Sequence, residues 1–333
     1  MTTLAPSTDY TGGAVNQGGK KTFVANLRAY VADLLGTDSA NKAAVRALLG
    51  VSPVAQDFRL SLTSGLPITT ADVTGASTLY ASPFAGNFIS LFDGTYWNAR
   101  ASAEFSIALT GLTSGKLYDV FAYDNAGVPA LELLVWTNDT TRATALAYQD
   151  GVLSKAGALT RRYLGTIYAT SATTTEDSKS KRYVWNGYHR VPRLIQRIEP
   201  TAQWTQATTA TWRQANASSA NQVGFVIGVA GDMVRADLNA MFSPNNGYKN
   251  AAALALDSIT VPTGLYGPSG SSSSSSVTEM PLVAKYAGTP AAGLHYLAWL
   301  EWMQSSGFTT TWYGTNNTAT YQTQCGILGE VMA

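Results

Sequence analysis

Cysteine, histidine and charge are all scarce in this 333-residue chain. It has one cysteine, Cys325, and two histidines. A single cysteine excludes an internal disulfide framework and cannot build a thiolate metal site alone, so we expect a buried, inert side chain. Charged residues make up 13% of the chain, about half the usual ~25%. The net charge is +1 without a basic cluster, which argues against nucleic-acid binding.

Long apolar runs are also missing. No stretch approaches the ~20 apolar residues that would cross a bilayer, and the first residues lack the basic and apolar regions of a secretion signal. No glycine motif of the phosphate-cradling kind stands in a strand–loop–helix context. The sequence therefore predicts a soluble protein made in a cytoplasm, without membrane insertion and without a bound cofactor.

The spacing of apolar residues changes near residue 52, from a helical period before it to short strand-like runs after it. Residues 1–52 predict an extended arm followed by two short amphipathic helices, the first ending at Gly36. Helices of this length are not stable alone in water, so we expect them to attach to a particle, to pack on their own copies, or to dock on the rest of the chain. The apolar residues assigned to attachment or oligomerisation are Phe23, Leu27, Tyr30, Leu34, Val45 and Leu48.

From Phe58 onward the sequence consists of short runs rich in Thr, Val, Tyr, Trp and Ile, separated by Gly, Asn, Asp or Pro. This texture is typical of antiparallel β-sandwiches and barrels. We predict a mainly β protein with a short α-helical N-terminal segment and two antiparallel β-sandwich or barrel-like domains, associated as a homotrimer. The predicted domains are 58–200 and 201–333, the second with a serine-rich loop at 269–276.

Few residues suggest catalysis. His189 and His295 are expected to be structural, and no cluster has metal-ligand spacing, although a Ca²⁺ at Asp119, Asp124 and Asn125 stays open. A glycan-cleaving enzyme would need two carboxyl groups, one on each side of the glycosidic bond that it cleaves, and the sequence does not single out such a pair. The candidate acids are Asp119, Asp124, Glu132, Asp139, Asp150, Glu176 and Glu301. We predict no catalytic, cofactor or metal residues.

Aromatic residues are the main candidates for binding. Eight tryptophans and seventeen tyrosines could stack on sugar rings where they are exposed, although most should pack in the core. Trp97, Trp302, Trp312 and Tyr313 lie near predicted turns, so these four are the candidate glycan contacts.

Several strings resemble proteins of tailed bacteriophages. LGTD at 35–38 and AAVRALLGV at 43–51 resemble a stretch near the N termini of tail fibres. Eight further strings resemble segments of phage fibre and minor structural proteins. These strings are LFDGTYW at 91–97, YDVFAYD at 118–124, TTRA at 140–143, RRYLGT at 161–166, VWN at 184–186, HYL at 295–297, LEW at 300–302 and TWYG at 311–314.

This resemblance implies a homotrimeric fibre or spike whose N-terminal end binds other virion proteins and whose far end meets the host. The expected function is that of a non-enzymatic virion protein, a tail fibre for host attachment, with a host-surface glycan as a further partner. The expected location is the virion, on the tail. Two alternatives stay open: a capsid-decorating or head-fibre protein, and a glycan-cleaving tailspike.

Overall fold

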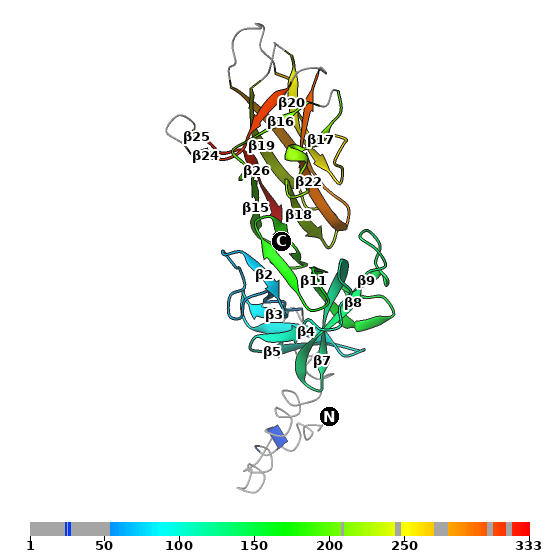
Figure 1. Cartoon of the computed structure of the whole chain (residues 1–333). Coiled ribbons are helices and arrows are strands. Elements are labelled where there is room, and N and C mark those ends of the chain that lie inside the picture. Colours follow the sequence, from blue (N-terminus) through cyan, green and yellow to red (C-terminus); the bar gives the residue numbers. More distant parts are fainter. Residues whose placement is uncertain are drawn as a thin grey trace, which may run out of the picture.

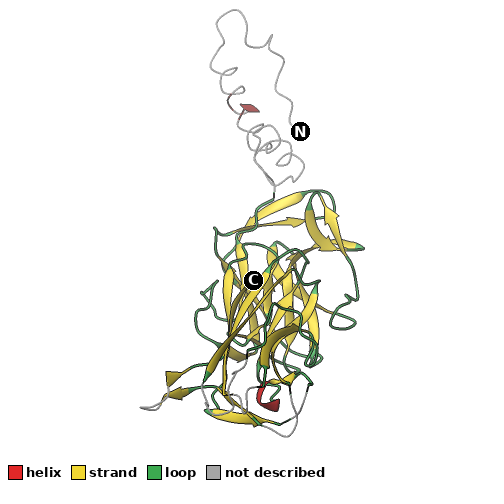
Figure 2. Cartoon of the chain, turned by 90° about the horizontal axis from the view of Figure 1, so that it is seen from above, coloured by secondary structure: helices red, strands yellow, loops and turns green. Residues whose placement is uncertain are grey.

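The computed structural model describes residues 54–207, 210–243, 248–269, 279–304, 309–317 and 322–333, together with Val24, Asn26 and Leu27. Strands make up nearly all the regular structure of the described body, as Figure 1 and Figure 2 show. A 3-10 helix, η2 (Ala215–Ala217), interrupts them. The prediction of a mainly β protein is confirmed.

Of the predicted N-terminal segment, the structure describes Val24, Asn26 and Leu27, all in helical conformation. Val24 and Leu27 have exposed side chains. Phe23, Tyr30, Leu34, Val45 and Leu48 lie outside the described residues, as does the serine-rich loop apart from Ser269. Attachment and oligomerisation through the first 52 residues therefore stay predictions.

One end of the elongated body is built from the first strands of the chain (Figure 1). A three-stranded sheet and a hairpin stand there, formed by β1 (Phe58–Ser61), β3 (Thr78–Pro83) and β6 (Phe105–Ala108), and by β4 (Phe88–Phe92) and β5 (Trp97–Ala101). Their core includes Leu79 and Ile89, and it continues onto Val120, Leu164 and Ile167 from two long strands of the next sheet.

The largest sheet has thirteen strands and runs the length of the body. Its strands are β2 (Val73–Ala76), β7 (Lys116–Asn125), β8 (Val128–Val135), β9 (Leu146–Gln149), β10 (Val152–Lys155), β11 (Ala158–Ala169), β12 (Thr175–Ser178), β13 (Lys181–Arg182), β14 (Val184–Asn186), β17 (Arg213–Gln214), β18 (Gln222–Ile227), β20 (Asn250–Leu256) and β22 (Gly293–Met303). Most pairings are antiparallel, but β13 runs parallel to β18 and joins the two ends of the body.

A six-stranded sheet covers the other end. Its strands are β15 (Pro192–Ile198), β16 (Gln203–Gln206), β19 (Val234–Ser243), β21 (Met280–Gly288), β23 (Thr310–Tyr313) and β26 (Gly326–Met332), and the small hairpin of β24 (Asn316–Asn317) and β25 (Gln322–Thr323) stands beside it. β15 pairs with β26 along its whole length. Hydrogen bonding thus continues across residue 200, where the sequence suggested a division.

Buried and exposed side chains alternate along the strands, and the buried ones form a second core between the thirteen-stranded and the six-stranded sheets. In β19, Val234, Ala236 and Leu238 are buried, whereas Arg235 and Asp237 point to solvent, the period of two expected of a half-buried strand. The buried apolar side chains of β19 belong to one cluster with Phe225 of β18 and Trp299 of β22. Two sheets therefore enclose one apolar layer at this end of the molecule.

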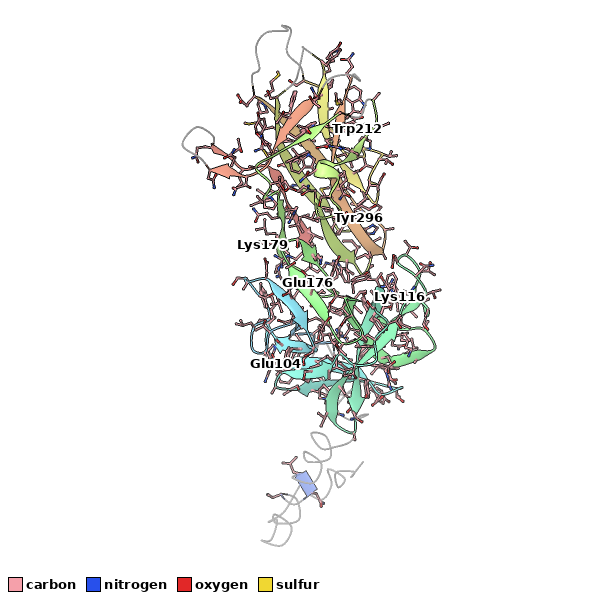
Figure 3. All side chains as sticks on the ribbon, in the orientation of Figure 1. Glu104, Lys116, Glu176, Lys179, Trp212 and Tyr296 are labelled. Atoms are coloured by element: carbon pink, nitrogen blue, oxygen red, sulfur yellow. The ribbon has the colours of Figure 1, made fainter. Side chains whose placement is uncertain are left out.

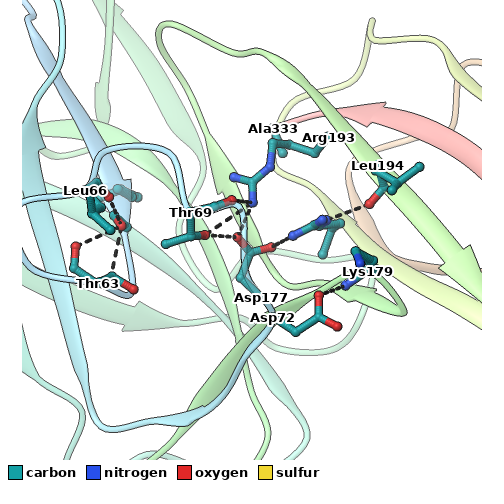
Figure 4. Close-up of polar contacts among 12 residues, drawn as sticks. Thr63, Leu66, Thr69, Asp72, Asp177, Lys179, Arg193, Leu194 and Ala333 are labelled. Atoms are coloured by element: carbon teal, nitrogen blue, oxygen red, sulfur yellow. Dashed lines mark hydrogen bonds and ion pairs between the residues drawn. The ribbon is translucent and has the colours of Figure 1, made fainter.

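A buried ion cluster holds the two ends together (Figure 4). Asp177 of β12 accepts from Arg182 Nη1 at 3.1 Å and from Arg193 Nη2 at 2.9 Å. Arg193 also donates to the carbonyl of Thr69, at 2.9 Å, and Arg182 donates to the carbonyl of Leu194, at 2.9 Å. The cluster therefore links the loop before β2 with β12, β13 and β15, and its three charged side chains are all buried.

Candidate functional site: an aromatic groove

Burial divides the eight tryptophans into two groups. Trp97, Trp136, Trp185, Trp204, Trp299 and Trp312 are at most 8% exposed. Trp212 and Trp302 are only partly buried, and their ring centroids lie 6.3 Å apart with 35° between the planes. Tyr266, 46% exposed, meets Trp212 edge to face with centroids 5.1 Å apart. The accessible indoles are thus collected at one place.

Alternation along β22 explains why Trp302 faces outward. Trp299 and Glu301 point into the core, so Trp302, one residue further on, points to the opposite face. There it stands directly across from Ala251 of β20. A small side chain at that position leaves room above the sheet, and Trp212, the residue before the neighbouring strand β17, closes the space.

Together these residues form a groove of about 370 Å³. We call it the aromatic groove, and its lining residues are Trp212, Lys249, Ala251, Tyr266, Pro268, Trp302 and Gln304. Figure 3 places Trp212 near the end of the body opposite Glu104 and the first strands. The groove therefore lies at the end remote from β3, β4 and β5.

Polar groups border the groove on one side. The backbone N–H of Lys249 donates to Gln304 Oε1 at 3.1 Å, and the N–H of Gln304 donates to the carbonyl of Lys249 at 3.0 Å. Both side chains are exposed. Within the described part of the chain no carboxylate lines the groove. Flat aromatic walls with a few amide and ammonium donors suit the stacking and hydrogen bonding of a sugar ring better than bond cleavage.

Directly behind the groove lies Glu301, which is fully buried. Its carboxylate accepts from Arg213 Nε at 2.6 Å and from the indole N–H of Trp204 at 2.7 Å. Burial raises the pKa of Glu301 to about 7, against the opposing effects of Arg213 and Trp204. Because the folded-state pKa is raised, this group's contribution to stability is complete below about pH 4.5 and is lost as pH rises through about 7.

Three of the four predicted glycan contacts must be withdrawn. Trp97, Trp312 and Tyr313 are buried, and buried rings cannot stack on a ligand. The indole N–H of Trp97 donates to Asp150, and that of Trp312 donates to Gln206. Proximity to a turn was the wrong criterion, because the ends of these strands are covered by neighbouring strands and loops. Trp302 alone keeps an accessible ring.

Two groove residues were missed from the sequence. Tyr266 stands between Gly264 and Pro268 in a loop, a context that signals exposure. Trp212 lies in a polar stretch without an alternating apolar partner, a weaker sign of the same kind. Neither signal shows that these rings meet Trp302, which depends on pairing between segments far apart in the chain.

Six of the seven candidate acids are engaged in structural contacts through their carboxylates, and Asp139 is exposed. Asp119 pairs with Arg142 at 2.8 Å and Asp124 with Arg100 at 2.5 Å, so the suggested Ca²⁺ site is taken up by guanidinium groups. The other contacts of these acids are Glu132 with Lys155 and Arg161, Asp150 with Trp97, Glu176 with Lys181, and Glu301 with Arg213. Among the described residues, no group of three or more His, Cys, Asp and Glu could hold a metal ion.

The histidines and the cysteine are also structural. His295 Nδ1 lies 2.8 Å from Asp257 and Nε2 lies 2.8 Å from the carbonyl of Ala291. Burial opposes protonation of His295, but these hydrogen bonds raise its pKa above the usual value. His189 contacts the carbonyl of Gln56 through Nε2. Cys325 is buried, and burial raises the pKa of its thiol to about 11, so it is a poor nucleophile.

A second hollow, of about 770 Å³, lies on the outer side of the six-stranded sheet. Leu194 of β15 and Leu328 of β26 are 41% and 52% exposed there, and Leu265 lines the same hollow from a loop bridged to Lys285 of β21. Charges of both signs stand between the leucines: Arg235 and Glu330 are opposite one another, as are Asp237 and Lys285. We call this surface the outer sheet face.

Comparison with known proteins identifies no family. No family model matches the chain, and no curated protein matches it. Within the described residues, no helix has the length and apolar character needed to cross a membrane.

Solved structures show only weak similarity. The stem and receptor-binding domain of the spike protein P1 from bacteriophage PM2 matches at 14% identity and a TM-score of 0.20, over 79% of this chain and 98% of the spike. Latent PorU from Porphyromonas gingivalis matches over 66% of this chain, at 9% identity and a TM-score of 0.26. The insecticidal toxin Cry8Ea1 from Bacillus thuringiensis matches over 83% of this chain, at 7% identity and a TM-score of 0.23. The chain spans 20% of PorU and 51% of the toxin. Scores this low identify no shared fold.

Proposed function

We propose that this protein is a bacteriophage virion protein, a tail fibre that attaches the particle to its host by binding surface saccharide in the aromatic groove. The observation that carries the proposal is the gathering of Trp212, Tyr266 and Trp302 at the end of the body away from the first strands. The N-terminal segment supplies the attachment to the particle. The low charge and the phage-like strings of the sequence support the same function.

Saccharide is the ligand class that best suits the groove. The apolar faces of pyranose rings stack on indole and phenol rings, and their hydroxyl groups bond to amide and ammonium groups. Two indoles at 35° can contact successive sugar rings along a bent chain. The amide of Gln304 and the ammonium of Lys249 stand beside them at the border.

Binding without cleavage is part of the proposal. Glycosidases use two carboxyl groups, one on each side of the scissile bond. The carboxylate nearest to the groove along the chain, Glu301, has no exposed surface and is held by Arg213 and Trp204. If purified protein releases new reducing ends from host polysaccharide, the tailspike alternative replaces this one.

Self-association into a homotrimer is proposed through the outer sheet face. This surface exposes Leu194 and Leu328, and large exposed apolar side chains that cluster mark interaction sites. Its charges balance, with Arg235 and Lys285 against Asp237 and Glu330, so three copies of the face can meet around a common axis without net repulsion. A face whose charges were all of one sign would be repelled electrostatically by its own copies.

Replacing Leu328 by Asp is expected to dissociate the oligomer, because the new carboxylate would be buried without a partner at the contact. Light scattering after size-exclusion chromatography should give a trimer mass for the wild type and a monomer mass for the variant. Val128→Asp is the control, since Val128 is 64% exposed on β8 and outside this face. A trimer that persists in Leu328→Asp would show that another surface holds the copies together.

The position on the particle tests the attachment function itself. Electron microscopy of particles decorated with an antibody against the β body should show label on the tail. Label spread over the capsid would instead establish the capsid-decorating alternative.

A further inference from the structure

The strand that presents Trp212 to the groove is held by few contacts. β17 contains only Arg213 and Gln214, which pair with Glu301 and Leu300 of β22. Residues directly opposite in an antiparallel pair point to the same face, so Arg213 points inward with Glu301. Trp212 precedes Arg213 and packs on the outer face, against the cluster of Leu300 and its neighbours. The inner contact of Arg213 therefore anchors the outer position of Trp212.

The surroundings of Glu301 leave one charged partner for it. From β17, Arg213 reaches Oε1 with Nε and Nη2, both at 2.6 Å. From β16, Trp204 donates its indole N–H to Oε2, and the backbone N–H of Asn216 in η2 approaches the same oxygen at 3.4 Å. On β20, the residue opposite Glu301 is Ala252, which carries no charge. Among the charged groups of the described residues, Arg213 is the one that acts on this carboxylate.

We propose that Glu301 is a positioning residue for the aromatic groove: through Arg213 it holds β17 and Trp212 against β22, so the geometry of the groove depends on the charge of Glu301. The link between this geometry and saccharide binding rests on the proposed function. The coupling of Glu301 to Trp212 does not.

The chemistry of the pair explains the direction of the effect. An ionised carboxylate accepts short charge-assisted hydrogen bonds from a guanidinium, roughly twice as strong as those between neutral groups. Once Glu301 binds a proton, that advantage is lost. The Arg213 side chain is 29% exposed, so it can then exchange the carboxyl for water, leaving the carbonyl of Thr205 as its other acceptor. Trp212 is thus held firmly at higher pH and loosely at lower pH.

Fluorine spectra of the full chain labelled with 5-fluorotryptophan test this without any ligand. The signals are assigned by single Trp→Phe replacements and followed between about pH 5.5 and 8.5. Trp204, which touches the carboxyl group, reports the titration of Glu301 itself. We expect the Trp204 and Trp212 signals to move together with a midpoint near pH 7, and the Trp212 line to broaden at the acid side.

Four variants separate positioning from simple structural support. Glu301→Gln should abolish both titrations. Arg213→Gln should leave the Trp204 titration and remove that of Trp212, whereas Arg213→Lys, which keeps the charge, should restore it. Asp257→Asn removes the carboxylate that pairs with His295 of β22, so it changes the titration of His295 and should leave Trp212 unaffected.

A Trp212 signal that does not change with pH in the wild type, or that still titrates in Glu301→Gln, would overturn the proposal. Since no saccharide is present, a failure here is distinguishable from a failure of the proposed function. The aromatic groove could bind sugar with a pH-independent Trp212, and Trp212 could be coupled to Glu301 in a groove that binds none.

Discussion

Asp177→Asn is expected to lower the free energy of unfolding by about 3–5 kcal/mol, the usual cost of breaking a buried ion pair by removing one partner. Asp177 is the carboxylate that pairs with both Arg182 and Arg193, and all three side chains are buried. An amide of the same size keeps the packing but leaves two guanidinium groups without a counter-charge. Urea or guanidinium denaturation followed by fluorescence measures the loss.

Asp124→Asn is the matched control, because it makes the same chemical change at a more accessible pair. Arg100, the partner of Asp124, is 39% exposed and can be hydrated when the charge is removed. The expected loss is below about 1 kcal/mol, as for most exposed ion pairs. Equal losses in the two variants would mean that the cluster in Figure 4 does not join the two ends of the body in the way described.

The second large effect concerns binding. Trp302→Ala and Trp212→Ala should each weaken saccharide binding by about 2 kcal/mol, or about thirtyfold, because truncating a central aromatic contact has the largest effects at binding sites. Titration calorimetry with the purified surface polysaccharide of the host measures the affinities. Near-ultraviolet circular dichroism checks that the variants keep their fold.

Tyr148→Ala is the control for this series. Tyr148 is 72% exposed on β9, outside the groove, so its removal should leave the affinity unchanged. If Tyr148→Ala and Trp302→Ala bind equally well, the rings of the groove do not contact the saccharide.

Local signals in the sequence predicted a mainly β protein because strand and turn preferences depend on neighbouring residues. The hairpin of β7 and β8 turns at Asp124–Gly127, where Ala126 and Gly127 have positive φ, as the Asp-Asn-Ala-Gly string suggests. Such elements need no knowledge of the rest of the chain. The segment 234–241 was compatible with a strand or a helical turn from its sequence, and the structure forms β19 there with alternating burial.

Long-range pairing could not be predicted. β15 finds its partner in β26, at the far end of the sequence, and β13 lies parallel to β18. Exposure of aromatics depends on these pairings, and this is why Trp312 proved buried while Trp212 did not. The buried pair of Glu301 and Arg213 has the same origin, since only the fold brings the two residues opposite one another.

The saccharide site is tested most directly by the fluorine spectrum of wild-type protein labelled with 5-fluorotryptophan, recorded with and without oligosaccharides cut from the host surface polysaccharide. The chain contains eight tryptophans, of which six are buried and serve as internal references. We predict that the signals of Trp212 and Trp302 shift on addition of sugar while the other six stay in place. A spectrum in which neither of these two signals moves would contradict a saccharide site in the aromatic groove.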